Sequence, residues 1–288
     1  MKYKFLFIIF LLTSFNLFSQ EYEDPHAYLD WKQIETKHFF INFYPGTENT
    51  AKVLAKIAEE VYPSITEIYN HEPDTKVSLI VKDYGDYSNG ASYYYDNKIE
   101  IWASALDFDL RGTHNWLRNV FTHEFTHLIQ LQTSMKFGRK VPAFYLQWMN
   151  YESERRPDVL YGFPNVLVSY PIPGTSIPAW FAEGVAQYNN PDLRYDYWDS
   201  HRDMILRMYA LSDSLLSWGD MGTFGKNSLG NESSYNAGFS LIQYISEKYG
   251  FDKVKEISYK MSSPLQYNLD GAIEKVLGKA GIDLYNEW

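Results

Sequence analysis

The 288-residue sequence contains no cysteine. Disulfide bonds are therefore excluded, and so are thiolate ligands for a metal ion and a lipid anchor on an N-terminal cysteine. A chain of this length does not need such covalent links, because it buries most of the surface that its unfolded form exposes. We therefore expect a domain that an ordinary hydrophobic core stabilises.

Positive charge is also scarce. The chain carries 26 lysine and arginine residues against 36 aspartate and glutamate residues, which gives a net charge of −10. Neither sign forms a long uninterrupted block, and the sequence has no internal repeat and no low-complexity tract. This balance argues against nucleic acid or an anionic membrane surface as the main partner.

Long apolar runs are absent after the N-terminal segment, so we expect no membrane span in the mature chain. Lys2 and Lys4 precede an apolar run at residues 5–12 and a more polar stretch that ends near Ser19. This layout predicts a signal peptide over residues 1–19, with a retained anchor as the alternative. We expect an exported protein, whether periplasmic, on the outer surface or secreted.

Hydrophobic periodicity and turn-forming residues predict a domain over residues 20–288 of the α+β class, in which a small mixed sheet precedes a mainly helical half. The first part, residues 20–105, should contain strands at 38–44, 77–81 and 98–102, a helix at 50–69 that Pro63 divides or kinks, and a loop or irregular hairpin at 84–97. The second part, residues 106–288, should contain helices at 116–131, from 178 to a stop at 189–191, and at 198–211, 235–249, 252–261 and 269–277, with a long irregular segment at 133–176.

The last residues, 283–288, have the pattern of the first turns of another helix, without a capping or stop signal. We therefore expect the chain to be the front of a longer polypeptide with a further C-terminal domain.

The strongest chemical signal is the pentapeptide at residues 123–127, His-Glu-Phe-Thr-His. On a helix, His123 and His127 lie one turn apart on one face and can bind one metal ion. Glu124 lies beside them and can take a proton from a water molecule that the metal activates. Two polar residues on a surface helix would be the alternative, but the flanking positions are apolar and predict a buried helix.

A catalytic zinc ion needs a third protein ligand. The metzincin continuation is ruled out, because Gln130 and Thr133 occupy its positions. Glu183 is the better candidate, since it is the single acid in an apolar helical run and precedes a glycine that would let two helices approach closely. The alternative is that the Glu183 carboxylate is no ligand and interacts with the positive N-terminal end of its helix. The other histidines have no obvious helical partner and are expected to be surface or satisfied core residues: His26, His38, His71, His114 and His201.

His-Glu-Phe-Thr-His followed by Trp-Phe-Ala-Glu-Gly-Val-Ala at 180–186 resembles the gluzincin metallopeptidases, the peptidase MA group that includes thermolysin-like enzymes and aminopeptidase N. The resemblance implies a thermolysin-like zincin fold, one catalytic Zn²⁺, a peptide or protein substrate, and Glu183 as the third metal ligand. The stretch around Tyr235 resembles the aminopeptidase N segment whose tyrosine stabilises the tetrahedral intermediate. An ordinary tyrosine at a helix start is the alternative for Tyr235.

The sequence departs from the aminopeptidase pattern in two places. The gap between His127 and Glu183 is much longer, and the Gly-x-Met-Glu-Asn strand that recognises the substrate amino terminus is missing. Of that motif, only the glycine is present around residues 89–92. The order of the motifs also resembles a secreted bacterial group in which such a domain precedes a β-propeller.

The sequence therefore predicts an exported zinc metallopeptidase that uses Glu124 as general base, with the substrate extended along an edge strand near residues 98–102. Two alternatives stay open. One is an aminopeptidase, and the other is a binding or assembly module that keeps zinc without proteolysis.

Overall fold

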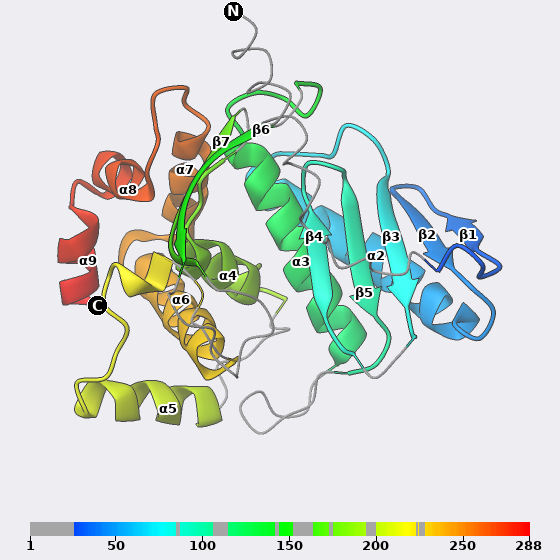
Figure 1. The fold of residues 1–288 in the computed structure, drawn as a ribbon, viewed down its shortest axis with the longest axis horizontal. Helices are drawn as coiled ribbons and strands as arrows, with labels where there is room; N and C mark the ends of the chain where they lie inside the picture. The colour runs from blue at the N-terminus through cyan, green and yellow to red at the C-terminus, as the bar shows by residue number, and fades with distance from the viewer. Residues whose placement is uncertain are drawn as a thin grey trace, which may run out of the picture. The chain divides into compact units, whose positions relative to one another are not determined.

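The computed structural model describes residues 26–84, 87–105, 115–141, 144–151, 164–172, 175–193, 200–222, 224 and 228–288. The chain divides into two compact units, Met1–Trp31 and Lys32–Trp288, and the labelled helices and strands of Figure 1 belong to the second. The predicted signal peptide, residues 1–19, lies outside the described residues. Within the described ranges, no helix is both long and apolar enough to cross a membrane.

The second unit begins with strands and one long helix, and helices dominate its remainder (Figure 1). The first elements are β1 (Lys32–Glu35), β2 (Phe39–Phe43), α2 (Glu48–Tyr69), β3 (Val77–Lys82), β4 (Gly90–Tyr93) and β5 (Lys98–Trp102). They are followed by α3 (Trp116–Ser134), β6 (Phe144–Tyr151), β7 (Pro164–Ile172), α4 (Ala179–Tyr188), α5 (Ser200–Leu211), the 3₁₀ helix η2 (Asp220–Gly222), α6 (Ser228–Tyr249), α7 (Phe251–Met261), α8 (Leu269–Leu277) and α9 (Gly281–Glu287).

The first five strands form one mixed sheet in the order β1-β2-β3-β5-β4. Strands β2, β3 and β5 run parallel, and the outer strands β1 and β4 pair antiparallel with their neighbours. Helix α2 makes the crossover between the parallel strands β2 and β3, as such a connection requires. Strand β4 therefore lies at an edge of the sheet, next to β5.

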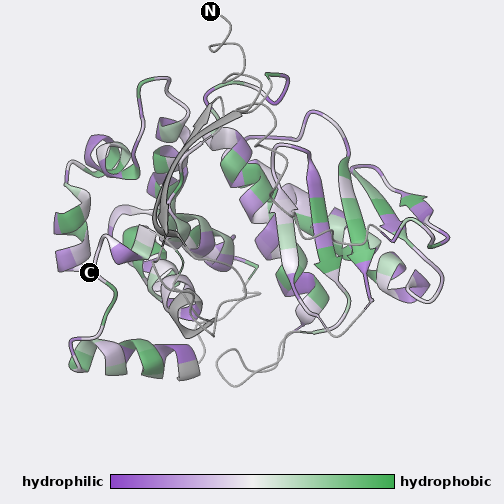
Figure 2. Cartoon of the chain, viewed as in Figure 1, coloured by the Kyte–Doolittle hydropathy of each residue, from purple (hydrophilic) through white to green (hydrophobic). Residues whose placement is uncertain are grey.

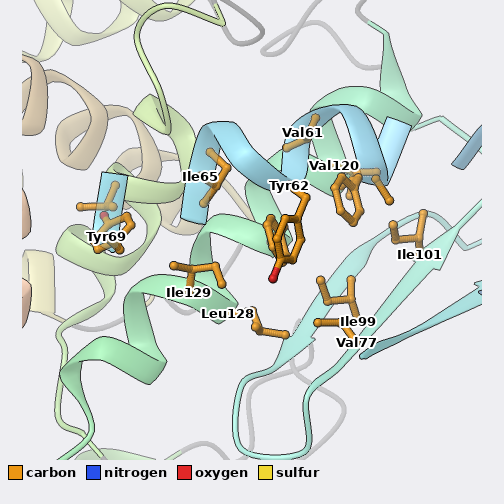
Figure 3. Close-up of a cluster of buried hydrophobic side chains, with 14 of the residues drawn as sticks. Val61, Tyr62, Ile65, Tyr69, Val77, Ile99, Ile101, Val120, Leu128 and Ile129 are labelled. Atoms are coloured by element: carbon orange, nitrogen blue, oxygen red, sulfur yellow. The ribbon is translucent and has the colours of Figure 1, made fainter. Parts of the chain in front are cut away.

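A hydrophobic core joins the sheet to helices α2 and α3. Every second residue of β3 and β5 is apolar and buried, and the hydrophobic colour dominates these two strands in Figure 2. The close-up in Figure 3 shows side chains of α2, such as Val61 and Ile65, in the same cluster as Ile99 of β5 and Leu128 of α3. Such burial is the main source of folding free energy in a domain without disulfides.

Helix α3 connects the two halves of this unit. It contacts α2, β4 and β5 on the sheet side, and α4 and α7 on the other side. Most of its residues are buried, including Phe121, Phe125 and Leu128. The polar motif of residues 123–127 is therefore held inside the protein, as the apolar flanks predict.

The mixed α/β class and most of the predicted elements are confirmed. The strands at β2, β3 and β5 and the helices α2, α3, α4, α5, α7 and α8 lie close to their predicted bounds. The segment predicted as a loop or irregular hairpin is a hairpin, since β4 pairs with β5 across a turn at residues 94–97. The edge strand expected near residues 98–102 is β4, since β5 itself lies between β3 and β4.

The prediction of an irregular segment at residues 133–176 was also wrong. It contains β6 and β7, which pair antiparallel from Phe144 opposite Ile172 to Tyr151 opposite Pro164. Prolines in this stretch favour a loop in a sequence-based interpretation. Both strands are edges of a two-stranded sheet, however, and an edge strand accepts Pro164 and Pro171 where its N–H groups are not needed for pairing.

Two helices differ from their predicted limits. Helix α6 begins at Ser228 and not at residue 235. Helix α9 begins at Gly281. Pro63 lies inside α2, which continues to Tyr69 as one element, so the proline does not divide the helix.

A buried ion pair lies between β3 and β5. Lys82 Nζ is 2.6 Å from Glu100 Oε2, and Lys98 Nζ is 2.8 Å from Glu100 Oε1. Burial alone would raise the pKa of Glu100, but the two ammonium groups lower it below its ordinary value. Lys82 also lies 4.4 Å from the centre of the Trp102 ring. Lys82 is the more buried of the two cations, so it is the more costly partner to remove.

We expect Lys82→Ala to lower the free energy of unfolding by about 3 kcal/mol at neutral pH, because it leaves a buried carboxylate with only one cation. Since the pKa of Glu100 is lowered in the folded state, the pair's stabilisation is present above the unfolded pKa and is lost as pH falls through the folded pKa. The variant should therefore lose less stability on acidification than the wild type. Urea unfolding at pH 7 and pH 3 measures both effects, and Lys98→Ala is the matched control with a smaller expected loss. Equal losses for the two lysine variants would contradict this assignment.

Candidate metal centre

Helix α3 presents two histidines to one point. His123 and His127 lie one helical turn apart, and their Nε2 atoms are 3.1 Å from each other. Their rings are nearly perpendicular, with centroids 4.7 Å apart. Two ring nitrogens this close, on side chains mostly removed from water, need a shared proton or a shared cation.

The third group comes from α4. Glu183 Oε2 lies 3.1 Å from His123 Nε2 and 3.1 Å from His127 Nε2. The three side chains are largely buried, and within the described residues they form a group that could hold a metal ion. The structure therefore brings together the three residues that the sequence nominated as metal ligands.

The charges of the three groups are strongly coupled. Burial alone would raise the pKa of Glu183, but the imidazoles of His127 and His123 hold it well below its usual range. Burial alone would lower the pKa of His127, whereas the carboxylates of Glu183 and Glu124 raise it above its ordinary value. The carboxylate thus attracts positive charge at this point, and a divalent cation would supply that charge in place of a proton.

The position of Glu183 in its helix excludes the alternative role. Helix α4 begins at Ala179, so Glu183 lies beyond the first turn, which contains no acidic residue. The helix N-terminus acts mainly on its own first turn. The two imidazoles are therefore the partners of this carboxylate.

Glu124 is buried on a neighbouring face of α3 and contacts strand β4. The Ser92 hydroxyl donates a hydrogen bond to Glu124 Oε2 over 2.8 Å. Gly90 lies against the same side chain, since a Cβ at this position would be 2.7 Å from Glu124 Oε1. Ser92 was not among the site residues predicted from the sequence, and Gly90 had been identified only as a remnant of another motif.

Tyr235 lies next to the three groups. Its ring stacks on that of His123 with 6.1 Å between centroids, and the ring of Phe224 lies at the same distance on Tyr235. Tyr235 is about two turns inside α6, which begins at Ser228, so the interpretation as a helix-start tyrosine was wrong. It is half-buried, at the border between the metal-binding group and solvent.

Two glycines fix the distance between α4 and α6. A Cβ on Gly184 would lie 2.5 Å from the backbone carbon and oxygen of Gly238, and a Cβ on Gly238 would lie 2.3 Å from the carbonyl oxygen of Trp180. The expectation that the glycine after Glu183 permits a close helix approach is confirmed. This contact holds the helix of Glu183 against the helix of Tyr235.

The remaining described histidines have other partners. His38 Nδ1 is 2.7 Å from Glu59 Oε2, and His71 Nε2 is 2.9 Å from Gln132 Oε1. His26 Nδ1 is 2.9 Å from the Tyr28 hydroxyl. His114 lies outside the described residues, and the side chain of His201 is not described. The expectation of satisfied or surface histidines is confirmed for His26, His38 and His71.

Comparison with protein-family models found no family that matches the chain, and comparison with curated proteins found no significant match.

We expect Gly184→Ala to destabilise the protein by about 1–3 kcal/mol or more, because the added methyl group meets backbone atoms of α6 that cannot rotate away. The shift of α4 should also weaken divalent metal binding, since Glu183 is the preceding residue. Thermal unfolding and metal titration measure the two effects. Gly138→Ala is the matched control, because a Cβ there meets nothing within 4 Å. A Gly184→Ala protein with the stability of the control would contradict the close contact.

Proposed function

We propose that the protein is an exported zinc metallopeptidase of the gluzincin type, with a thermolysin-like catalytic domain. His123, His127 and Glu183 hold the metal, and Glu124 is the general base. The observation that carries this proposal is the convergence of two imidazole nitrogens and one carboxylate oxygen, each 3.1 Å from the other two. The exported location depends on residues 1–19, which lie outside the described part of the chain.

The spacing of these atoms suits zinc. Zinc binds histidine nitrogen and carboxylate oxygen at about 2.0–2.2 Å, so tetrahedral ligands lie roughly 3.3–3.6 Å from one another. The three atoms need to move apart by only a few tenths of an ångström to match. Three protein ligands also leave one position for water or substrate, which is the pattern of a catalytic and not of a structural zinc site.

Zinc, when bound, would lower the pKa of a water molecule and polarise the carbonyl group of the scissile peptide bond. Glu124 follows a ligand directly in the chain and contributes a carboxylate that can accept the proton of that water. The same carboxyl group can then deliver the proton to the leaving amine. A structural metal site has no use for such a base, which favours hydrolysis over a purely binding or assembly role.

We infer that Tyr235 acts on the developing charge and not on the metal. Its ring stacks on that of His123, which supports this role by putting the side chain beside the ligand cluster. A phenol hydroxyl can donate a hydrogen bond to the oxyanion that forms when the carbonyl carbon is attacked.

Strand β4 offers a surface for an extended peptide. Asn89 O accepts a hydrogen bond from Trp102 N, and in an antiparallel pair such bonded positions alternate. Ala91 and Tyr93 therefore pair with β5, whereas the main-chain groups of Gly90 and Ser92 face the other way. A peptide that pairs with this edge would run past Glu124, and main-chain pairing orients a substrate with little regard to its side chains.

The composition of β4 bears on the choice between endopeptidase and aminopeptidase. The strand Gly90–Tyr93 has the sequence Gly-Ala-Ser-Tyr and carries no acidic side chain that would bind a free amino terminus. We therefore favour cleavage within peptides. Digestion of a mixed peptide library by the purified protein, with blocked and free amino termini, decides between the two.

We expect Glu183→Ala to lose zinc and Glu124→Gln to keep zinc but lose turnover. The first change removes a ligand, and even the loss of a group that only supports a ligand lowers metal affinity about 10- to 100-fold. The second change removes only the proton acceptor. Metal analysis and peptide cleavage on both variants are the measurements, and each variant is the control for the other. Full zinc content in Glu183→Ala would place the third ligand elsewhere, and zinc binding without cleavage in the wild type would favour the binding module.

We expect Tyr235→Phe to keep the fold and the zinc and to lower kcat about 10²- to 10³-fold, with KM close to unchanged, because one donor to the transition state is lost. Tyr249→Phe is the matched control, since Tyr249 ends the same helix and its hydroxyl group donates to Glu287 Oε2 over 2.8 Å. Steady-state kinetics on a cleaved peptide measure the effect. Wild-type kcat in Tyr235→Phe would assign the oxyanion contact to another residue.

A further inference from the structure

Strand β4 and helix α3 meet at the side chain of Glu124. Gly90 is the first residue of β4, and a Cβ there would lie 2.7 Å from Glu124 Oε1 and 2.9 Å from Glu124 Cγ. It would also lie 2.5 Å from Cγ2 of Val120, one turn earlier on α3. The carboxylate therefore occupies the space that any larger residue at position 90 would need.

Ser92 binds the same carboxylate from the next position on that face of the strand. Its Oγ lies 2.8 Å from Glu124 Oε2 and 2.5 Å from the main-chain oxygen of Glu124. Residues two apart on a strand point to the same side, so Gly90 and Ser92 meet α3 together. One oxygen of the carboxylate lies over the glycine, and the other is bound by the serine.

The strand that carries Ser92 is itself fixed on α3. Gln132 Nε2 donates to the Tyr94 carbonyl oxygen over 2.8 Å and to Asn97 Oδ1 over 2.9 Å, and both acceptors belong to the turn between β4 and β5. Strand β4 is thus bound to α3 at two points, more than two helical turns apart. A hydroxyl on this strand has little freedom to follow a side chain that moves.

A serine hydroxyl suits this position, because its single hydrogen can be donated either to Glu124 Oε2 or to the main-chain oxygen of Glu124. Both acceptors belong to the same residue, so either bond keeps Ser92 against Glu124 without any movement of the strand.

From this geometry we propose that Ser92 is a positioning residue for the general base. It holds the Glu124 carboxylate in one orientation, and Gly90 provides the space for it. The inference rests on the proposed function as far as it concerns catalysis, whereas the contact between Ser92 and Glu124 can be measured without activity. A serine that only ties the strand to the helix would affect stability and leave kcat of the folded, metal-loaded protein unchanged.

The kinetic test compares Ser92→Ala with Ser92→Thr and Ser88→Ala. We expect Ser92→Ala to keep its zinc content and KM and to lose about ten- to a hundredfold in kcat, because a misplaced base acts poorly. Ser92→Thr keeps the hydroxyl group and should recover most of kcat. Ser88→Ala is the matched control, since Ser88 precedes the same strand, is only partly buried and donates to the Ser104 carbonyl oxygen and not to Glu124. Wild-type kcat in Ser92→Ala would overturn the proposal.

A second measurement does not depend on hydrolysis. Thermal unfolding of the metal-free wild type, Ser92→Ala, Glu124→Ala and the double variant forms a double-mutant cycle. We expect Ser92→Ala to lower Tm clearly in the wild type and much less when Glu124 is already alanine. Equal shifts in both backgrounds would overturn the contact. Should Ser92→Ala fail to fold, Ser92→Cys, a close isostere with a weaker donor, takes its place in both tests.

The two measurements separate the two proposals. A wild type that binds no zinc and cleaves no peptide rejects the proposed function, and the cycle still reports on Ser92 and Glu124. A wild type that cleaves peptides, with unchanged kcat in Ser92→Ala and additive Tm shifts, rejects the positioning role alone.

Discussion

The contact between Gly184 and Gly238 is the constraint on which the site depends. Because neither residue has a side chain, the backbones of α4 and α6 touch, and Glu183 and Tyr235 both reach His123 of α3 from different helices. A methyl group at either glycine would separate the two helices by more than the tolerance of a metal site, whose ligand distances vary by only about 0.2 Å. The geometry of the metal site therefore requires the close packing of α4 against α6.

The proposed metal ligands and the proposed general base lie on different faces of helix α3. His123 and His127 are one turn apart and point to α4, whereas Glu124 is displaced by about 100° and points to β4. The ligands and the base thus receive their supporting contacts from different elements, Glu183 on one side and Ser92 on the other. The apolar residues of a third face, Phe121 and Phe125, pack in the core and keep the helix from rotating.

The parts of the site that follow from local sequence could be predicted, and those that follow from packing could not. The spacing of His123 and His127 determines their common face, and a lone acid in an apolar helix nominated Glu183. The role of Ser92 could not be predicted, because Gly-Ala-Ser-Tyr has low strand propensity and becomes a strand only by pairing with β5. The order of strands depends on long-range pairing, so the edge position of β4 could not be read from the chain. The same holds for the pairing of β6 with β7, since the two prolines of β7 are typical of loops.

The hairpin of β6 and β7 also changes the cost of assembling the site. About 55 residues separate His127 from Glu183, and the entropy lost on closing such a loop grows with its length. Phe144 lies opposite Ile172, however, so once the hairpin has formed, only the short connections from α3 to β6 and from β7 to α4 remain to be closed. Between the end of α3 and the start of α4, this shortens the free loop from about 44 to about 17 residues and reduces the closure cost by about 0.8 kcal/mol. Strands β6 and β7, which contain no proposed ligand, would thereby speed the meeting of α3 and α4, the two helices that carry the ligands.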